Sequence, residues 1–277
     1  MNTDGHFLIG KQHMSSGLPC QDYSLSGNIS DNIAYAIVSD GCSSGQRTDV
    51  GARVVSLATE KALRSISFKG FTPQVISHYQ QAGIESSKDL FGLCVQDMLA
   101  TCLYALVSPE GAMVHIQGDG VVAYKMRNGD IQIYMYDWAE NTPCYPAYAH
   151  DGYASFICHH GNDMSQEKAT CKTLHINSKG ETIFEATENI SLGEGVQGFS
   201  QNILPEKLVD ISCIAVFSDG VEQVENTSCA QVVASLLDFK NTQGVFATRR
   251  LNRCIKDWQK QNISPLDDIS YAVIHIP

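Results

Sequence analysis

The sequence predicts one α+β domain over residues 1–277, in which antiparallel sheets are covered by helices on both sides. Three observations support this prediction. Apolar runs of strand length recur along the chain, and helical patterns come in pairs. The blocks follow the order strands, two helices, a hairpin-rich block, two helices and a last strand. Neither an internal repeat nor a glycine- and serine-rich linker divides the chain, which favours a single domain.

Strand signals are clearest in the first half of the chain. The runs at residues 5–10 and 33–39 are alternating or continuously apolar. The strands predicted at 121–127 and 131–136 flank Asn128-Gly129, a pair of residues that favours a tight hairpin turn. The other predicted strands are residues 112–118, a second hairpin in KTLHINSKGETIFEA, and the runs ISCIAVFS and ISYAVIHI.

Helical periodicity predicts two pairs of helices. The residues that define the first pair are Val54, Val55, Ala58, Ala62 and Ile66 in one helix and Val95, Leu99, Cys102, Leu103 and Leu106 in the other. The second pair is predicted near residues 222–238 and 244–262. Between the two hairpins, residues 137–171 are rich in proline, histidine, glycine and aromatic residues. We expect this irregular excursion to form a flap beside the functional site that influences substrate choice.

Composition restricts the possible partners. Aspartate and glutamate outnumber lysine and arginine by 30 to 19, and the net charge of −11 argues against nucleic acid or an anionic membrane as partner. The ten cysteines include no CxxC pair, so a structural zinc site is not expected. The N-terminus lacks a signal-peptide pattern, and no apolar run reaches the roughly 18 residues of a membrane span. The expected location is the cytoplasm, with reduced thiols.

Five aspartates lie at the ends of predicted strands. They are Asp22, Asp40, Asp119, Asp219 and Asp267. If these strands are neighbours, the five carboxylates converge at one end of the sheets. Carboxylates about 4 Å apart repel one another unless cations lie between them. Magnesium and manganese prefer oxygen ligands, and two such ions could polarise a water molecule and hold a phosphoryl group.

The order of the acidic motifs resembles a known family. The motifs have the order found in the metal-dependent type 2C serine/threonine protein phosphatases, namely QD, SDGCSSG, GDG, FSDGVEQ and DDIS. The stretch SGLPCQD is similar to bacterial members of that family. The resemblance extends from about Gly10 to the C-terminus. It implies a four-layer αββα sandwich of two central antiparallel β-sheets flanked by helix pairs. It also implies hydrolysis of phosphoserine and phosphothreonine, by direct attack of water activated by two Mn²⁺ or Mg²⁺ ions. The implied partners are a phosphoprotein and its cognate serine/threonine kinase.

The resemblance further implies roles for individual residues. Asp40 would bridge the two ions, and the Gly41 carbonyl would bind one of them. Asp219 and Asp267 would complete the ligands of the other ion. Asp22 would orient the water molecules around the ions, so that Asp22, Asp40 and Asp219 form the expected catalytic group.

Several positions depart from the family pattern. Asp119 resembles the position that binds a third, weaker ion, but it stands in GDG where GDS is more usual. Gln21 replaces a common acid and would contact the second ion through water. Asp268 replaces a common asparagine and is an alternative ligand. No arginine precedes the first motif, so His13 or Lys11 would have to contact the substrate phosphate.

Three other motifs suggest different chemistry. CSSGQR, from Cys42, is similar to the loop of cysteine-dependent phosphatases, but it has one residue too few before the arginine. Cys42 is instead expected in a small pocket beside the metals. GEGVQG, residues 193–198, matches a dinucleotide motif, yet residues 189–192 are a poor strand, so a flexible loop is predicted. His159 and His160 lack a suitably spaced carboxylate for zinc and are expected to be solvated.

A phosphatase fold retained as a regulatory or binding module without catalysis is the remaining alternative. Asp40, Asp219 and Asp267 argue against it, because clustered acids without a bound cation would destabilise the fold by repulsion. Metal-dependent turnover of a small aryl phosphate would separate the two hypotheses.

Overall fold

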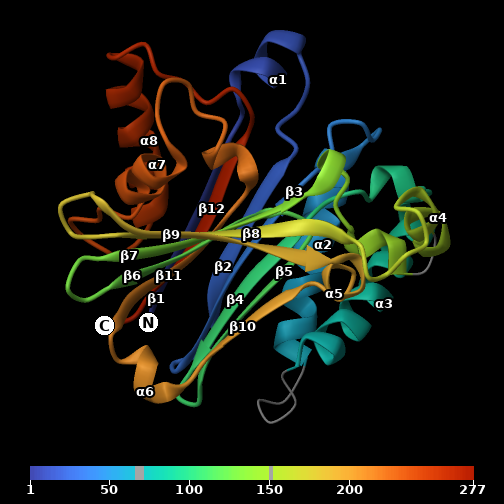
Figure 1. The fold of residues 1–277 in the computed structure, drawn as a ribbon, viewed down its shortest axis with the longest axis horizontal. Helices are drawn as coiled ribbons and strands as arrows, with labels where there is room; N and C mark the ends of the chain where they lie inside the picture. The colour runs from blue at the N-terminus through green and yellow to red at the C-terminus, as the bar shows by residue number, and fades with distance from the viewer. Residues whose placement is uncertain (66–71, 150–151) are drawn as a thin grey trace.

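The computed structural model describes residues 1–65, 72–149 and 152–277. Two antiparallel β-sheets pack face to face at its centre, and helices cover the two outer faces (Figure 1). This arrangement confirms the four layers that the sequence predicts. Ile66, which was expected on the first helix, lies outside the described residues.

The larger sheet has seven strands and the smaller has five, and all neighbouring strands are antiparallel. Across the first sheet the order is β1 (Asn2–Leu8), β12 (Ile269–His275), β11 (Ile211–Phe217), β6 (Gly120–Met126), β7 (Ile131–Trp138), β8 (Glu167–Ile176) and β9 (Thr182–Ser191). Across the second it is β10 (Phe199–Ile203), β5 (Gly111–Gln117), β4 (Cys102–Ser108), β3 (Ile33–Asp40) and β2 (Asp22–Ser30).

The strands near the centre of each sheet are apolar on both faces because both faces are covered. Along β3, Val38 faces the other sheet, whereas Ile37 faces the helices. Along β11, Val216 points between the sheets and Phe217 points outward to a second helical layer. Continuous apolar runs such as IAYAIVS therefore reflect the central position of these strands.

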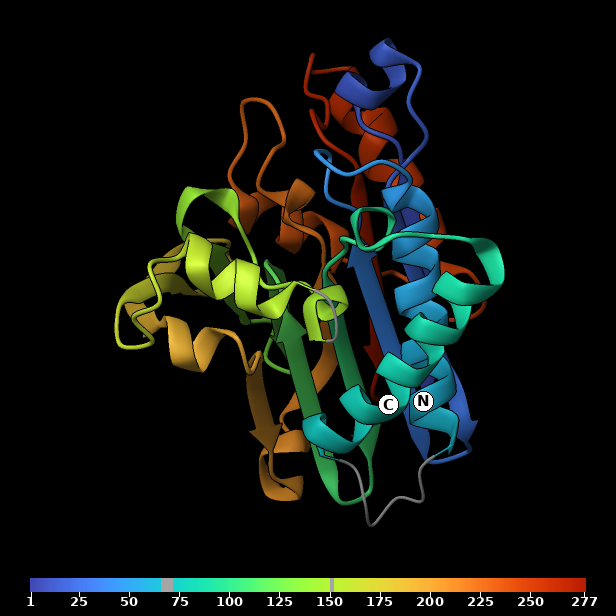
Figure 2. The same ribbon diagram turned by 90° about the vertical axis from the view of Figure 1, so that its right-hand side faces the viewer.

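Two helix pairs form the outer layers. α2 (Thr48–Ser65) and α3 (Pro73–Phe91) pack on the five-stranded sheet, as Figure 2 shows from the side. α7 (Cys229–Leu236) and α8 (Phe246–Gln259) pack on the seven-stranded sheet, which confirms the second predicted pair. No helix in the described segments is long and apolar enough to cross a membrane.

The helix predicted around residues 95–106 is wrong. Only the 3-10 turn η2 (Val95–Asp97) forms there, and the apolar residues that follow belong to β4. β4 is buried on both faces, so its unbroken apolar run fits a buried helix as well as a strand. The true partner of α2 is α3, which presents only a narrow apolar face to the protein because Gln80 and Gln81 are buried beside Ile76 and Ile84.

The predicted excursion at 137–171 is shorter and more ordered than expected. β7 continues to Trp138, and β8 begins at Glu167. The elements between them are η3 (Ala139–Asn141), η4 (Pro146–Ala149) and α4 (Tyr153–His159). Phe156 on α4 joins the core between the sheets. The structure therefore anchors this segment by an aromatic side chain rather than leaving it as an open loop.

The GEGVQG segment is likewise more ordered than predicted. β9 reaches Ser191, which caps the short helix α5 (Leu192–Gly195). A Cβ atom on Gly195 would lie 2.7 Å from the Trp138 ring, so this glycine permits close packing. His160 is also buried rather than solvated, with its ring 4.5 Å from that of Phe156. The remaining short helices are α1 (Lys11–Ser16), α6 (Pro205–Leu208) and the turn η5 (Asp219–Val221).

Candidate active site

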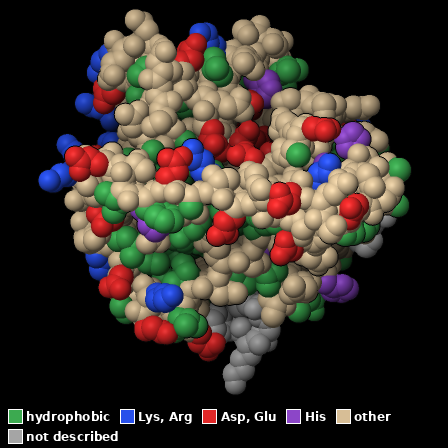
Figure 3. Space-filling view, viewed as in Figure 1, with side chains coloured by type: hydrophobic (Ala, Val, Ile, Leu, Met, Phe, Trp, Pro, Cys, Tyr) green, Lys and Arg blue, Asp and Glu red, His purple; other side chains and the backbone are tan. Residues whose placement is uncertain are grey.

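The strand ends bring four of the predicted aspartates into one cleft. Its volume is about 380 Å³, and the acidic residues that line it include Asp40, Asp119, Asp219 and Asp267. Figure 3 shows acidic side chains gathered in a hollow on this face of the molecule. The cleft thus brings together residues from β3, from the β5–β6 turn, from the end of β11 and from the start of β12, as the sequence predicts.

Glycines on either side of the acids let the backbone approach closely. Gly118 and Gly120 both have positive φ values, of 104° and 130°, and they turn the chain so that Asp119 lies between β5 and β6. A Cβ atom on Gly41 would lie 2.6 Å from the carbonyl oxygen of Thr48. Only glycine therefore lets α2 begin this close to Asp40.

Asp22 lies beneath the cleft and is fully buried. It pairs with Asp40 across β2 and β3, and its Oδ2 accepts a hydrogen bond from Ser218 Oγ at 2.6 Å. Ser218 Oγ in turn accepts from the backbone N–H of Ser270 at 2.9 Å. These bonds join three strands at one carboxylate. Oδ1 of Asp22 has no hydrogen-bond partner within the described part of the chain.

Burial and nearby negative charges raise the pKa values of Asp22, Asp40 and Asp119. Burial raises the pKa of Asp22 to about 7 and that of Asp119 to about 8. The pKa of Asp40 is raised well above its usual range, first by burial and then by the charges of Asp22 and Asp219. Such a cluster is stabilised by protons or by cations. Its oxygen-only donor set and the unpaired Asp22 oxygen fit a hard divalent cation.

Two further acids beside the cleft are not apparent from the sequence. Glu222 has a pKa raised to about 8, by burial and then by the charges of Asp137 and Asp219. The pKa of Asp137, at the end of β7, is also raised by burial. Glu222 lies within FSDGVEQ, three residues after Asp219. This spacing, close to one helical turn, is the sequence signal that places the two acids near each other. Asp137 carried no comparable signal, because the sequence pattern placed it at the start of the irregular excursion rather than on a strand.

Gln223 connects two of the predicted ligands. Its Nε2 donates to Asp219 Oδ2 at 3.0 Å and to Asp267 Oδ2 at 3.5 Å. This amide holds the two carboxylates at the same side of the cleft, although they belong to different loops. Its place four residues after Asp219, about one helical turn, is the sequence signal for this contact.

Asp268 has a different environment from its neighbour Asp267. Its Oδ1 accepts from the Gly10 backbone N–H at 2.7 Å, and its Oδ2 accepts from the Gln21 N–H at 2.6 Å. Oδ2 also lies 2.9 Å from His13 Nδ1. Asp268 is buried and ties the N-terminal segment to β12, while Asp267 lines the cleft. Asp267 is accordingly the better placed of the two for a cation.

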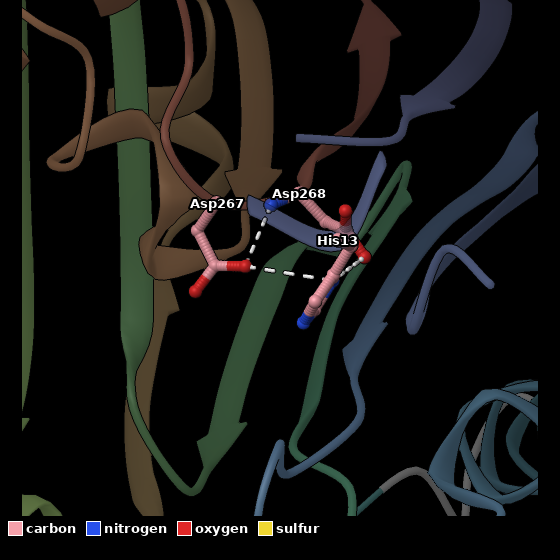
Figure 4. Close-up of side chains that lie close together, drawn as sticks. All are labelled: His13, Asp267 and Asp268. Carbon is pink, nitrogen blue, oxygen red and sulfur yellow. Dashed lines mark hydrogen bonds and ion pairs between the residues drawn. The ribbon is translucent and has the colours of Figure 1, made fainter. Parts of the chain in front are cut away.

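His13, Asp267 and Asp268 form a compact group, with potential ligand atoms within 4.8 Å of one another. Figure 4 shows the three side chains, with dashed lines from His13 to both carboxylates. Because Asp268 already accepts two backbone N–H groups, hydrogen bonding explains this arrangement without an ion.

Neither His13 nor Lys11 is among the residues that line the acidic cleft. His13 is buried against Asp268, and the Lys11 ammonium lies 3.5 Å from Glu225 with most of its side chain exposed. Among the described residues that line the cleft there is no lysine or arginine. The expectation that one of these two residues contacts the substrate phosphate therefore receives no support from the geometry.

Gln21 is buried beside the cleft. Its Nε2 donates to Thr48 Oγ1 at 2.9 Å, and its Oε1 has no hydrogen-bond partner in the described segments. Cys42 lines the cleft with its Sγ 3.0 Å from Ser44 Oγ, which agrees with a position beside the metals. Arg47 turns away to Asp97, so CSSGQR does not form the anion-binding loop of a cysteine-dependent phosphatase.

The sequence profile of the family described as Protein phosphatase 2C matches residues 9–258. The chain belongs to the protein phosphatase 2C family. As a member of this family, it is a metal-dependent protein phosphatase. The family acts on phosphoproteins. A search of curated protein sequences finds no significant match to the chain.

Solved structures of bacterial phosphatases share the fold of this phosphatase. Stp1 from Staphylococcus aureus aligns with a TM-score of 0.58 and 11% identity, over 100% of this chain and 96% of that chain. A bacterial serine phosphatase aligns with a TM-score of 0.55 and 10% identity, over 100% and 98%. The serine/threonine phosphatase of S. agalactiae aligns with 0.52 and 12%, over 99% of each chain. At such low identity the likeness concerns the fold alone.

Proposed function

We propose that this phosphatase hydrolyses phosphoserine and phosphothreonine in proteins, with two Mn²⁺ or Mg²⁺ ions held by Asp40, Asp219 and Asp267. The convergence of these carboxylates in one cleft is the observation that carries the proposal. The repulsion between these clustered carboxylates is what a divalent cation offsets. Asp119 lies in the same cleft and would hold a third, weaker ion.

The residues of the chain would divide the remaining tasks. The Gly41 carbonyl would add a ligand next to Asp40, and Asp22 would orient water from beneath. Gln223 would keep Asp219 and Asp267 in place through its amide. When bound, the cations would polarise a water molecule and share the charge that develops on the phosphoryl oxygens. In this mechanism water attacks phosphorus directly, and no covalent phosphoenzyme forms.

The wider context is also part of the proposal. We propose residues 1–277 as one catalytic domain that acts in the cytoplasm, in signalling, opposite a cognate serine/threonine kinase. The net charge of −11 disfavours nucleic acid and anionic membranes as partners. A binding module without catalysis is disfavoured. Such a module would not need Asp40, Asp219 and Asp267, yet all three are present.

One assay tests the assignment. Phosphate release from a phosphoserine peptide should require Mn²⁺ or Mg²⁺ and should stop when a chelator is added. The same protein should turn over a small aryl phosphate with the same metal dependence. Activity that persists in the chelator would contradict the proposed ligands, and absence of any activity with either ion would favour the binding module.

A further inference from the structure

A second groove opens directly beside the acidic cleft. Its volume is about 400 Å³, which is within the range of ligand-binding clefts. Four residues line both hollows, namely Cys42, Ser44, Asn141 and Tyr145. A polypeptide with its phosphorylated residue in the acidic cleft would therefore present a neighbouring residue to this groove.

The groove has a mainly apolar and aromatic lining. Tyr145, Tyr148 and Phe156 form a row of rings, with successive centroids 5.7 Å and 5.3 Å apart. Val95 and Leu99 contribute from the segment that precedes β4. Within the described chain no lysine, arginine, aspartate or glutamate lines this groove. His159 is the one described lining residue that can carry a positive charge, so most of the groove surface offers an apolar side chain a place to be buried.

The backbone between the cleft and the groove is strained. Glu140 and Asn141 both adopt left-handed conformations, with φ values of 60° and 51°. Asparagine tolerates this region, but glutamate rarely enters it. Such conformations persist where the surroundings enforce them, and they concentrate at ligand sites. Glu140 lines the cleft and Asn141 lines both hollows, so the strain lies at their shared edge.

We propose that this groove, formed by η2, residues 141–148 and α4, is a subsite for an uncharged apolar or aromatic residue near the phosphorylated residue of the substrate. The inference rests on the proposed function, because it uses the acidic cleft as the place of the phosphate. Its occupant is the phosphoprotein substrate itself. An acidic residue at that position would instead approach the carboxylates of the cleft, with no lysine or arginine among the described lining residues to offset them.

A series of phosphoserine peptides tests the subsite. Each of the six positions from three residues before to three residues after the phosphoserine is varied in turn. The varied position carries phenylalanine, leucine, glycine or aspartate. At one position, kcat/KM with Mn²⁺ should be about tenfold higher for phenylalanine or leucine than for glycine. It should be lowest for aspartate. Equal values at every position would overturn the subsite. Mn²⁺-dependent turnover of a small aryl phosphate tests the phosphatase separately, so the two failures are distinguishable.

A filling variant and a matched control locate the preference. Ser155 is exposed on α4 and lines the groove, so Ser155→Trp should occupy it. The ratio of kcat/KM between phenylalanine and glycine peptides should then fall to within about twofold. Ala154 is exposed on the same helix and is not among the residues lining the groove, so Ala154→Trp should retain the preference. An undiminished ratio in Ser155→Trp, with a thermal midpoint like that of the control, would overturn the proposal.

A charge pair at one position provides a second, independent test. Gln96 is exposed and lines the groove. Gln96→Lys should raise the kcat/KM of the aspartate peptide relative to the glycine peptide, by about three- to tenfold at low salt. Gln96→Glu, which has a similar size and the opposite charge, should lower that ratio. If both variants change the ratio in the same direction, or leave it unchanged, the peptide does not cross this groove.

Discussion

Asp40 is the residue whose charge most affects both folding and chemistry. It is flanked by Asp22 and Asp219, whose charges raise its pKa together with burial. Without a cation, this carboxylate destabilises the folded state at neutral pH, because the folded protein holds it among like charges. The same feature makes the site suitable for divalent ions. A negative charge at this position therefore lowers the stability of the metal-free protein but favours the binding of the ions needed for activity.

We expect Asp40→Asn to lower phosphate release by about 10³-fold or more, since a lost metal ligand removes several kcal/mol of transition-state stabilisation. The variant should stay folded, and in chelator its thermal midpoint should be at or above that of the wild type because one like charge is gone. Mn²⁺ should raise the midpoint of the wild type and raise that of the variant much less. Full activity in Asp40→Asn would refute its assignment as a ligand.

Gln21 Nε2 donates a hydrogen bond to Thr48, and Gln21 Oε1 has no hydrogen-bond partner among the described residues. We predict that this oxygen faces the second ion. Gln21→Glu supplies a carboxylate in place of that oxygen, and we expect the Mn²⁺ concentration for half-maximal activity to fall by about 10-fold, within the range typical of residues that support ligands. The maximal rate should change little. The lost Nε2 hydrogen bond to Thr48 should cost about 1 kcal/mol of stability. An unchanged or higher Mn²⁺ requirement would mean that Gln21 does not face the ions.

At the scale of elements, the loop after Asp40 is held by a link between α2 and η2. Arg47 Nε and Nη2 donate to the two oxygens of Asp97, each at 3.0 Å, and Asp97 also accepts from the Cys94 N–H at 2.9 Å. Burial alone would raise the pKa of Asp97, but these hydrogen bonds outweigh it and lower the pKa to about 2. The link fixes the start of α2 beside Gly41 and thus one wall of the cleft.

This link predicts a distinct dependence of stability on pH. Because the folded-state pKa of Asp97 is depressed, its contribution is present above its ordinary pKa near 4 and is lost as the pH falls toward 2. We expect the wild type to lose more unfolding free energy than Arg47→Ala as the pH falls from 5 to 3, because only the wild type has the hydrogen bonds that depress this pKa.

Urea unfolding at pH 5, 4 and 3 provides the measurement for this prediction. Arg47→Lys is the matched control, since it keeps the charge but cannot bind both oxygens, and it should fall between the wild type and Arg47→Ala. Identical acid sensitivity in all three proteins would mean that the link does not contribute to stability.

At the scale of the whole molecule, the two sheets hold the strand ends that form the cleft, and the chain carries an excess of acidic residues. The net charge of −11 should attract cationic substrates over distances of about one Debye length, roughly 10 Å at 0.1 M salt. This long-range effect differs from local recognition in the groove, because it depends on the total charge of the peptide rather than on one side chain.

Two phosphopeptides with identical residues next to the phosphoserine, and with lysines or glutamates only at distant positions, test this long-range effect. At low salt the lysine peptide should show the higher kcat/KM, by about tenfold. At 0.5 M salt the difference should shrink to near unity, while the preference at the groove persists. A salt-independent difference would indicate direct contacts with the distant residues.

The sequence alone determined the parts of this protein that depend on local pattern. The aspartates at strand ends, the hairpin around Gly129 and the helices on the seven-stranded sheet all follow from periodicity and turn chemistry over a few residues. The order of the acidic motifs along the chain indicated the family. These features are encoded locally, so they can be predicted without knowing which segments meet.

Only the tertiary structure decided what depends on contact between distant segments. β4 is a strand because it pairs with β3 and β5, whereas its apolar pattern alone also fits a buried helix. Asp267 faces the cleft while Asp268 anchors the N-terminal segment, although the two are adjacent in sequence. Gln223 acquires its role because the end of β11 meets the start of β12. In each case the environment of the side chain is set by residues far along the chain, and a single sequence does not specify that environment.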